Sequence, residues 1–332
     1  MHGFLLGAIV VRALALQPHA TVDPFGARSL MAVASDGSVA ATTTVDGFSR
    51  RIVVWNAAGR RRVLGTGAVA GFDRDGSLLI NAPSPMRVGG GSAQPIDLRS
   101  CENFPQSSVG PLVDGVLTDG ALIVTMQSPS IVDLDDTSGQ NAPVVLHVRS
   151  DLCTNLGNGV ALATAGSYAA GYTAYIAGVP APSNVASNRE RFTAVRWNER
   201  ARQPLGPGIA TAVNSAGDAA GSDLPPGGMA YENRPHARAW IGGTGATPIA
   251  GDARLSVAYA IDAHDRVLGM LEDAAKRHYA FVWQNGRLQR LDDVVHDPAW
   301  RFECAYAFAP DGSVVGVGTY RGHPTAFRLW GL

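Results

Sequence analysis

The chain has 332 residues, of which 46% are hydrophobic and 17% are charged, and it contains 39 glycines and 20 prolines. This composition is typical of a turn-rich globular protein and argues against disorder, collagen and coiled coil. The formal net charge is -1, so the sequence predicts neither a nucleic-acid surface nor electrostatic attraction to an anionic membrane. The three cysteines are too few and too scattered for a zinc site, and no CxxC, HExxH, GxSxG, Walker or GxGxxG motif occurs. We therefore expect no metal and no cofactor.

A short turn recurs along the chain between two apolar runs rich in small residues. Its clearest copies contain Asp36-Gly37, Asp75-Gly76, Asp119-Gly120 and Asp311-Gly312, and weaker copies fall near residues 166, 217 and 265. The mean spacing is about 46 residues, a period typical of propeller blades or helical arrays. Asp-Gly turns between alternating runs favour β-hairpins. The sequence therefore predicts an all-β fold, a seven-bladed β-propeller with four antiparallel strands per blade, A to D from the tunnel outward.

The repeats predict one domain over residues 1–332, because each propeller blade buries its faces only against its neighbours. The units start near residues 30, 67, 111, 158, 209, 256 and 303. The spacing indicates that tryptophan recurs at one position of the repeat unit. The tryptophans at this position are Trp55, Trp197, Trp240, Trp283 and Trp330. A residue repeated in this way most simply packs one blade against the next. We expect a monomer.

Residues 210–332 resemble the HAF-repeat family, which is named after a His-Ala-Phe triplet. The segments that carry the resemblance are residues 260–269 and 279–286 and variants of the triplet at His236-Ala237-Arg238, Tyr279-Ala280-Phe281 and Thr325-Ala326-Phe327. The stretch from Leu291 to the C-terminus is similar to the closing repeat of that family. The resemblance implies a bacterial, commonly exported β-propeller, extracellular or periplasmic, with no general activity attached to the family. It carries over no catalytic residue.

Functional residues are expected on the face that bears the B-to-C and D-to-A loops. The B-to-C loops lengthen at residues 126–143, 172–190 and 222–235, whereas the A-to-B turns stay short. Long loops on a rigid scaffold are common binding sites. The D-to-A segment 293–302 belongs to the same face, and the candidate ligand-binding residues on it are Asp135, Tyr175, Arg189, Tyr231, Glu232, Arg234, His236, His296 and Trp300.

Two of these candidates have a specific interpretation. Trp300 is the one tryptophan outside the repeat and is a candidate for stacking on a ligand. His236 lies near Glu232 and Arg234 and could supply acid or base chemistry, although its place in the triplet also suits a structural histidine.

Two classes of function remain open. The first is a non-catalytic binding or scaffold propeller that recognises a small polar or carbohydrate-like ligand, such as a glycan, or a protein partner on the long-loop face. The second is a propeller-based enzyme of hydrolase, lyase or cyclase type with its active site in the same cup. Small and apolar residues in the inner strands predict a tunnel with few ionisable groups.

The N-terminal segment has two interpretations. The seventh unit has no residues left for a D strand at Leu332, so we expect residues 1–16 to close the ring as its outer strand. The alternative is that the apolar residues 4–15 belong to an export signal, although Arg12 interrupts them. If residues 1–16 form the closure strand, we expect a cytoplasmic protein. An export signal would instead agree with the extracellular or periplasmic location that the family resemblance implies. No other segment suggests a membrane span.

The cysteines carry a separate prediction. Cys101 and Cys153 follow the outer strands of adjacent units and could form a disulfide in an oxidising compartment. Cys304 precedes an inner strand and is expected to be a buried free thiol.

Overall fold

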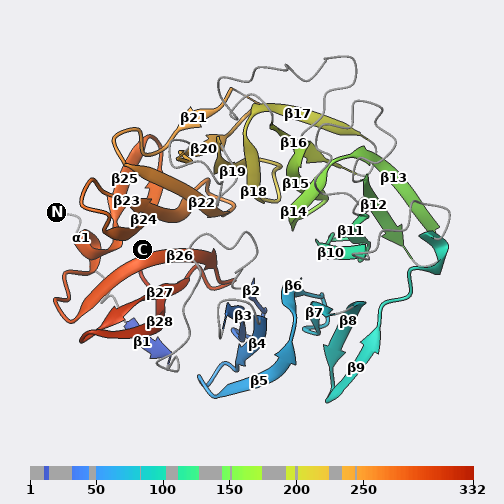
Figure 1. Cartoon of the computed structure of the whole chain (residues 1–332), viewed down its shortest axis with the longest axis horizontal. Coiled ribbons are helices and arrows are strands. Elements are labelled where there is room, and N and C mark those ends of the chain that lie inside the picture. Colours follow the sequence, from blue (N-terminus) through green and yellow to red (C-terminus); the bar gives the residue numbers. More distant parts are fainter. Residues whose placement is uncertain are drawn as a thin grey trace, which may run out of the picture.

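The protein folds into a ring of seven blades around a central axis (Figure 1). The computed structural model describes residues 11–14, 32–44, 50–82, 84–101, 111–126, 144–149, 152–173, 192–198, 201–223, 234–243 and 245–332. Each blade is a sheet of four strands, and neighbouring strands are antiparallel. The predicted all-β, seven-bladed propeller is thereby confirmed.

The first three blades follow one another along the chain, each running from its inner to its outer strand. Blade one consists of β2 (Ala32–Val33), β3 (Val39–Thr44), β4 (Arg50–Trp55) and β5 (Arg61–Thr66). Blade two consists of β6 (Ala68–Phe72), β7 (Leu78–Ala82), β8 (Ser84–Gly89) and β9 (Ser92–Pro95). The 3-10 helix η1 (Arg99–Cys101) leads to blade three, which consists of β10 (Pro111–Val116), β11 (Leu122–Met126), β12 (Val144–Arg149) and β13 (Leu152–Asn158).

The next three blades repeat this order. Blade four consists of β14 (Val160–Ala165), β15 (Tyr168–Thr173), β16 (Thr193–Trp197) and β17 (Arg202–Pro207). Blade five consists of β18 (Ile209–Val213), β19 (Ala219–Ser222), β20 (Ala237–Trp240) and β21 (Thr247–Pro248). Blade six consists of β22 (Leu255–Ile261), β23 (Val267–Glu272), β24 (His278–Gln284) and β25 (Arg287–Arg290), and it is followed by the short helix α1 (Leu291–Val295).

The seventh blade joins the two ends of the chain. Its inner strands are β26 (Trp300–Phe308), β27 (Val314–Tyr320) and β28 (His323–Leu329), and its outer strand is β1 (Val11–Leu14). Val11 lies opposite Leu329, and Leu14 lies opposite Ala326. Figure 1 shows this N-terminal strand against the edge of β28. The predicted closure strand is therefore present, and it covers an edge that would otherwise expose unpaired backbone groups.

Four tryptophans occupy one register position on the third strand of their blades. Each lies opposite the first or second residue of the neighbouring second strand and is at most 5% exposed: Trp55, Trp197, Trp240 and Trp283. In blade seven this position is taken by Leu329, opposite Val314. The prediction that Trp330 shares it was wrong. Successive strand residues point to opposite faces, so the one-residue offset places the Trp330 indole where its Nε1 donates to Asp311 Oδ2 at 3.0 Å.

Polar side chains on second strands connect neighbouring blades in the first half of the ring. Thr42 Oγ1 accepts a hydrogen bond from Val69 N at 2.9 Å, and Thr125 Oγ1 accepts one from Ala161 N at 3.1 Å. The side chain of Asn81 accepts from the backbone N of Val113 and donates to its carbonyl. In each case a polar group of one blade binds the inner strand of the next, which fixes adjacent blades relative to one another.

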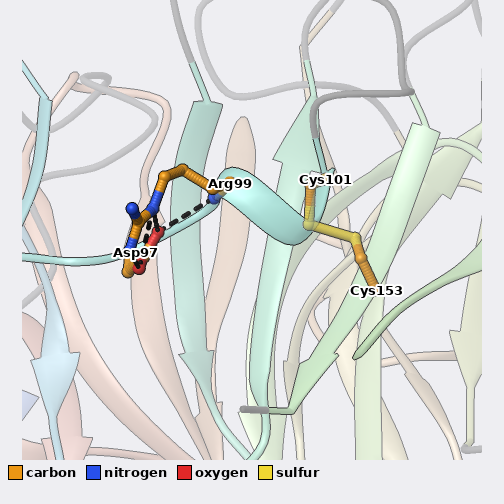
Figure 2. The surroundings of a disulfide bond; sticks show 4 residues. All are labelled: Asp97, Arg99, Cys101 and Cys153. Atoms are coloured by element: carbon orange, nitrogen blue, oxygen red, sulfur yellow. Dashed lines mark hydrogen bonds and ion pairs between the residues drawn. A yellow bond between two sulfur atoms is a disulfide. The ribbon is translucent and has the colours of Figure 1, made fainter. Parts of the chain in front are cut away.

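Cys101, at the end of η1, forms a disulfide with Cys153 in β13, and the two Cα atoms are 5.4 Å apart (Figure 2). The bond ties the segment that leaves blade two to the outer strand of blade three. Beside it, Arg99 forms an ion pair with Asp97. Cys304 is buried and free, and burial raises the pKa of its thiol. The disulfide that the sequence allowed is present, and the predicted buried thiol is confirmed.

Candidate functional site

The connections between second and third strands are unequal around the ring. In blades three, four and five they span residues 127–143, 174–192 and 223–236. In the other blades they are only residues 45–49, 83, 273–277 and 321–322. Because strands alternate in direction, all of these connections lie on the face where the inner strands begin. The long connections therefore belong to three consecutive blades on one face, which we call the long-loop face.

Five of the candidate residues on this face lie outside the described residues, namely Asp135, Tyr175, Arg189, Tyr231 and Glu232. The structure describes Arg234, His236, His296 and Trp300. Arg234 and His236 precede β20 of blade five, His296 lies in the connection between blades six and seven, and Trp300 begins β26 of blade seven. They are thus on the long-loop face, but on different parts of it.

His236 is held in place by Asp223 at the start of β20. Its backbone N donates to Asp223 Oδ1 at 2.7 Å, and its carbonyl accepts from Asp223 N at 3.0 Å. Asp223 is buried, and its Oδ2 lies 3.5 Å from Arg238 Nη2. The hydrogen bond to the backbone amide and the nearby guanidinium offset the cost of burying this carboxylate. This arrangement fixes the backbone from which the His236 imidazole projects, and the half-buried Arg234 lies two residues before it.

His296 and Trp300 have different surroundings. His296 is exposed and caps α1 in a left-handed conformation, with φ of 54°. Trp300 begins β26, is 7% exposed and stacks parallel to Phe302 with ring centroids 5.3 Å apart. Tyr320 and Phe327 complete the aromatic cluster around its indole. The Trp300 ring thus packs mainly on protein rings, while His296 presents its side chain to solvent.

Sequence reasoning missed an acid–base cluster on the same face, at the strand ends of blade six. Glu272 is the last residue of β23, and its carboxylate is buried and forms an ion pair with Arg254. The Oε2 atom of Glu272 lies 3.1 Å from Nε2 of His278. Burial lowers the pKa of His278; the nearby Glu303 acts in the opposite direction, and Arg301 lowers it further. The His278 imidazole therefore favours its neutral form, which can accept or donate a proton.

A cavity of about 330 Å³ occupies the centre of the ring. It is lined by residues of the innermost strands of all seven blades, most of them Ala, Gly, Val, Phe and other uncharged residues. Asp114 is the one carboxylate among the described lining residues. This lining agrees with the prediction of a tunnel that carries few ionisable groups.

Other kinds of site find no support in the described part of the chain. Within it, no group of three or more His, Cys, Asp or Glu side chains is placed to hold a metal ion. Its helices are likewise too short or too polar to span a membrane.

Comparison with known proteins identifies the fold and no more. No family model matches the chain, and no curated protein matches it. The β-propeller domain of the Trilobed protease from Pyrococcus furiosus, which has an open velcro topology, is similar with a TM-score of 0.54 and 9% identity over 91% of this chain and 95% of that chain. The acylaminoacyl peptidase from Pyrococcus horikoshii is similar with a TM-score of 0.53 and 11% identity, over 91% of this chain and 50% of that chain. The chain is thus a seven-bladed β-propeller similar to those of peptidases, and it spans half the length of the second of them.

Proposed function

We propose that the protein is a non-catalytic binding propeller that recognises a small polar or carbohydrate-like ligand, or a protein partner, on its long-loop face. The observation that carries this proposal is the concentration of long connections on three consecutive blades. Their bases are rigid, because the second strands from which they leave are fixed within four-stranded sheets, as at Met126 and Ser222. Variable loops on such a base are a common way to build a binding surface.

Membership of the HAF-repeat family is part of this proposal. The alanines of the three variant triplets, Ala237, Ala280 and Ala326, occupy equivalent register positions and are fully buried. Phe281 and Phe327 lie opposite Gly269 and Gly316, where an added Cβ would lie 2.6 Å and 2.5 Å from the rings. All three triplets thus supply a small buried residue, and two of them supply a ring that packs on glycine, whereas Arg238 lies opposite Gly221 in the third. That role is structural, so the family assigns no chemistry to His236.

We place the protein in an oxidising compartment, the periplasm or the extracellular space. The support is the Cys101–Cys153 disulfide, since cytosolic proteins rarely keep structural disulfides. The proposal of a monomer rests on the closed ring, in which β1 covers the edge of β28.

A propeller-based enzyme is the second candidate, and the cluster of Arg254, Glu272 and His278 favours it. A carboxylate and an imidazole within 3.1 Å of each other are the groups that general acid–base catalysis needs. However, the negative charge of Glu272 is already balanced by its ion pair with Arg254. In addition, neither Glu272 nor His278 lines the central cavity. Binding without turnover is therefore the better supported function.

A thermal-shift screen with neutral mono- and oligosaccharides tests the binding face. We expect at least one sugar to raise the melting temperature of the wild type, because a ligand that binds only the folded state stabilises it. The triple variant Arg189→Ala, Tyr231→Ala, Arg234→Ala is expected to lose this shift and to keep its ligand-free melting temperature within a few degrees. The matched control Arg61→Ala, Arg62→Ala, on exposed positions of β5, should keep the shift.

Three outcomes would contradict the proposal that the long-loop face is a non-catalytic binding site. An unchanged shift in the triple variant would place the ligand elsewhere, and consumption of a sugar during the screen would favour the enzyme. If no sugar binds, a photo-crosslinking residue at position 231, compared with one at position 61, tests a protein partner. Equal or absent crosslinking at the two positions would overturn the binding-face proposal.

A further inference from the structure

The outer hairpin of blade one, formed by β4 and β5, concentrates arginine. Arg50 and Arg51 begin β4, and Arg60, Arg61 and Arg62 lie at the other end of the hairpin, just before and at the start of β5. All five are exposed, and we call them the arginine surface. Residues 50–72 contain no Asp or Glu, whereas the whole chain has a formal net charge of -1. The hairpin is therefore a local positive surface on a nearly neutral protein.

The arginine surface has no counter-charge of its own. In the described part of the chain, none of its five guanidinium groups forms an ion pair, a hydrogen bond or a cation–π contact. Third-strand arginines of four other blades instead form ion pairs with aspartates: Arg87 with Asp73, Arg149 with Asp119, Arg238 with Asp223, and Arg328 with Asp311. The guanidinium groups of blade one are thus available to an external anion.

Strand pairing sets the spacing of these charges. Arg61 and Arg62 lie opposite the last two residues of β4. Since side chains alternate along a strand, Arg51 and Arg61 share the face of the sheet toward blade seven, and Arg50 and Arg62 share the face toward blade two. The members of each pair are four strand positions apart, which corresponds to about 13 Å. Figure 1 shows β5 on the outer rim of the ring, so positive charge lies at both ends of this rim and on both of its sides.

We propose that the arginine surface binds a linear anionic polysaccharide, one that carries carboxylate or sulfate groups. The planar guanidinium group pairs with such oxyanions through two parallel hydrogen bonds. One ion pair at an exposed position contributes little in water, so a useful affinity needs several pairs at once. A chain with charges on successive sugars supplies them, and it is long enough to reach both ends of the hairpin.

Other polyanions fit the arginine surface less well. Single-stranded nucleic acid binds through aromatic rings as well as charge, yet Trp55, the one aromatic residue among residues 50–66, is buried. Protein partners need apolar residues at the centre of the interface, and peripheral attachment to membranes needs apolar insertion. The hairpin offers only Val63 for either role, a residue that is 43% exposed. The arginines on the edge strand β5 also oppose pairing with a strand of another chain.

The arginine surface is separate from the long-loop face, whose long connections belong to blades three, four and five (Figure 1). Binding of neutral sugars on the long-loop face does not require the charges of blade one. Either proposal can therefore fail without the other.

Fluorescence anisotropy of labelled polygalacturonate and labelled dextran sulfate, titrated with the full chain at low and at physiological ionic strength, tests the proposal. At least one of the two chains is expected to bind saturably and to weaken as salt is added, and a preference between them identifies the anionic group. Any binding of neutral dextran should not depend on the arginine surface.

Two charge-matched variants locate the binding. The first should weaken binding of the anionic chain about tenfold or more, and the second, on exposed positions of blades six and seven, by at most about threefold. The substitutions of the first are Arg50→Gln, Arg51→Gln, Arg61→Gln and Arg62→Gln, and those of the second are Lys276→Gln, Arg287→Gln, Arg301→Gln and Arg321→Gln. The half variants Arg50→Gln, Arg51→Gln and Arg61→Gln, Arg62→Gln should each weaken binding, because the chain contacts both ends of the hairpin.

Four results would overturn the proposal. The first is the absence of binding by both anionic chains, and the second is equal weakening by the two charge-matched variants, which would mean attraction to positive charge anywhere on the protein. Tighter binding of single-stranded DNA or polyglutamate at the same ionic strength would assign the surface to a nucleic acid or an acidic protein. Tighter binding of phosphatidylserine vesicles would assign it to a membrane. If the first variant does not melt cooperatively, the two half variants decide the question in its place.

Discussion

Deleting residues 2–16 is expected to cost the protein several kcal/mol of stability and to make it aggregate. The deletion removes β1, whose four residues pair with Ala326–Leu329 of β28. Each lost backbone hydrogen bond contributes about 1 kcal/mol, and the exposed edge of β28 becomes a template for pairing with other chains. Urea denaturation and light scattering of the truncated and complete chains measure the two effects.

Adding the missing strand in trans supplies the control for this deletion. A synthetic peptide of residues 2–16 should bind the truncated chain and restore much of its melting temperature, whereas a peptide with the same residues in scrambled order should not. A truncated chain that is monomeric and as stable as the complete one would show that blade seven needs only its three C-terminal strands.

Removing the Cys101–Cys153 disulfide is expected to lower the free energy of unfolding by up to about 4 kcal/mol, because the bond closes a loop with a sequence separation of 52 residues. The double variant Cys101→Ala, Cys153→Ala avoids a lone thiol at either site. Its free energy of unfolding, measured in urea, should match that of the wild type under reducing conditions.

The thiol content of the wild type provides an independent check. Titration of the denatured, unreduced protein should give one free thiol, that of Cys304. The double variant should not respond to a reducing agent. Three free thiols in the wild type, or equal stability of wild type and double variant, would contradict the disulfide and with it the argument for an oxidising compartment.

The fold could be predicted because the recurring turn has a strong local cause. Gly37, Gly76, Gly120 and Gly312 adopt φ between 78° and 88°, a region that suits glycine. The preceding aspartates accept a hydrogen bond from the backbone two residues on, as Asp36 does from Ser38 N at 2.8 Å. Such turns depend on adjacent residues only, so their spacing is visible in the sequence and reports the blades.

Two features that depend on tertiary contacts were not predicted. Helix α1 has five residues, too few to be stable alone, and is held by burial of Leu291 and by a hydrogen bond from Phe302 N to Asp292 Oδ1 at 3.2 Å. The displacement of Trp330 by Leu329 is a one-residue shift of register, which tryptophan spacing alone does not reveal.

The candidate site was predicted only in outline. Loop length indicated the long-loop face, because insertions are visible without knowledge of the fold. The cluster of Arg254, Glu272 and His278 was missed, since its members lie at strand ends and in a short connection and meet only through strand pairing. Five of the predicted residues lie outside the described part of the chain.

Shortening the long connections tests the proposed binding face most directly. Residues 127–143, 174–191 and 224–233 would each be replaced by a copy of the short connection of blade one, residues 45–49, which joins equivalent strands. The account predicts a variant that keeps the circular dichroism and cooperative melting of the wild type but loses the sugar-dependent thermal shift. A shortened variant that folds and still binds the same sugars or partner as the wild type would contradict the account.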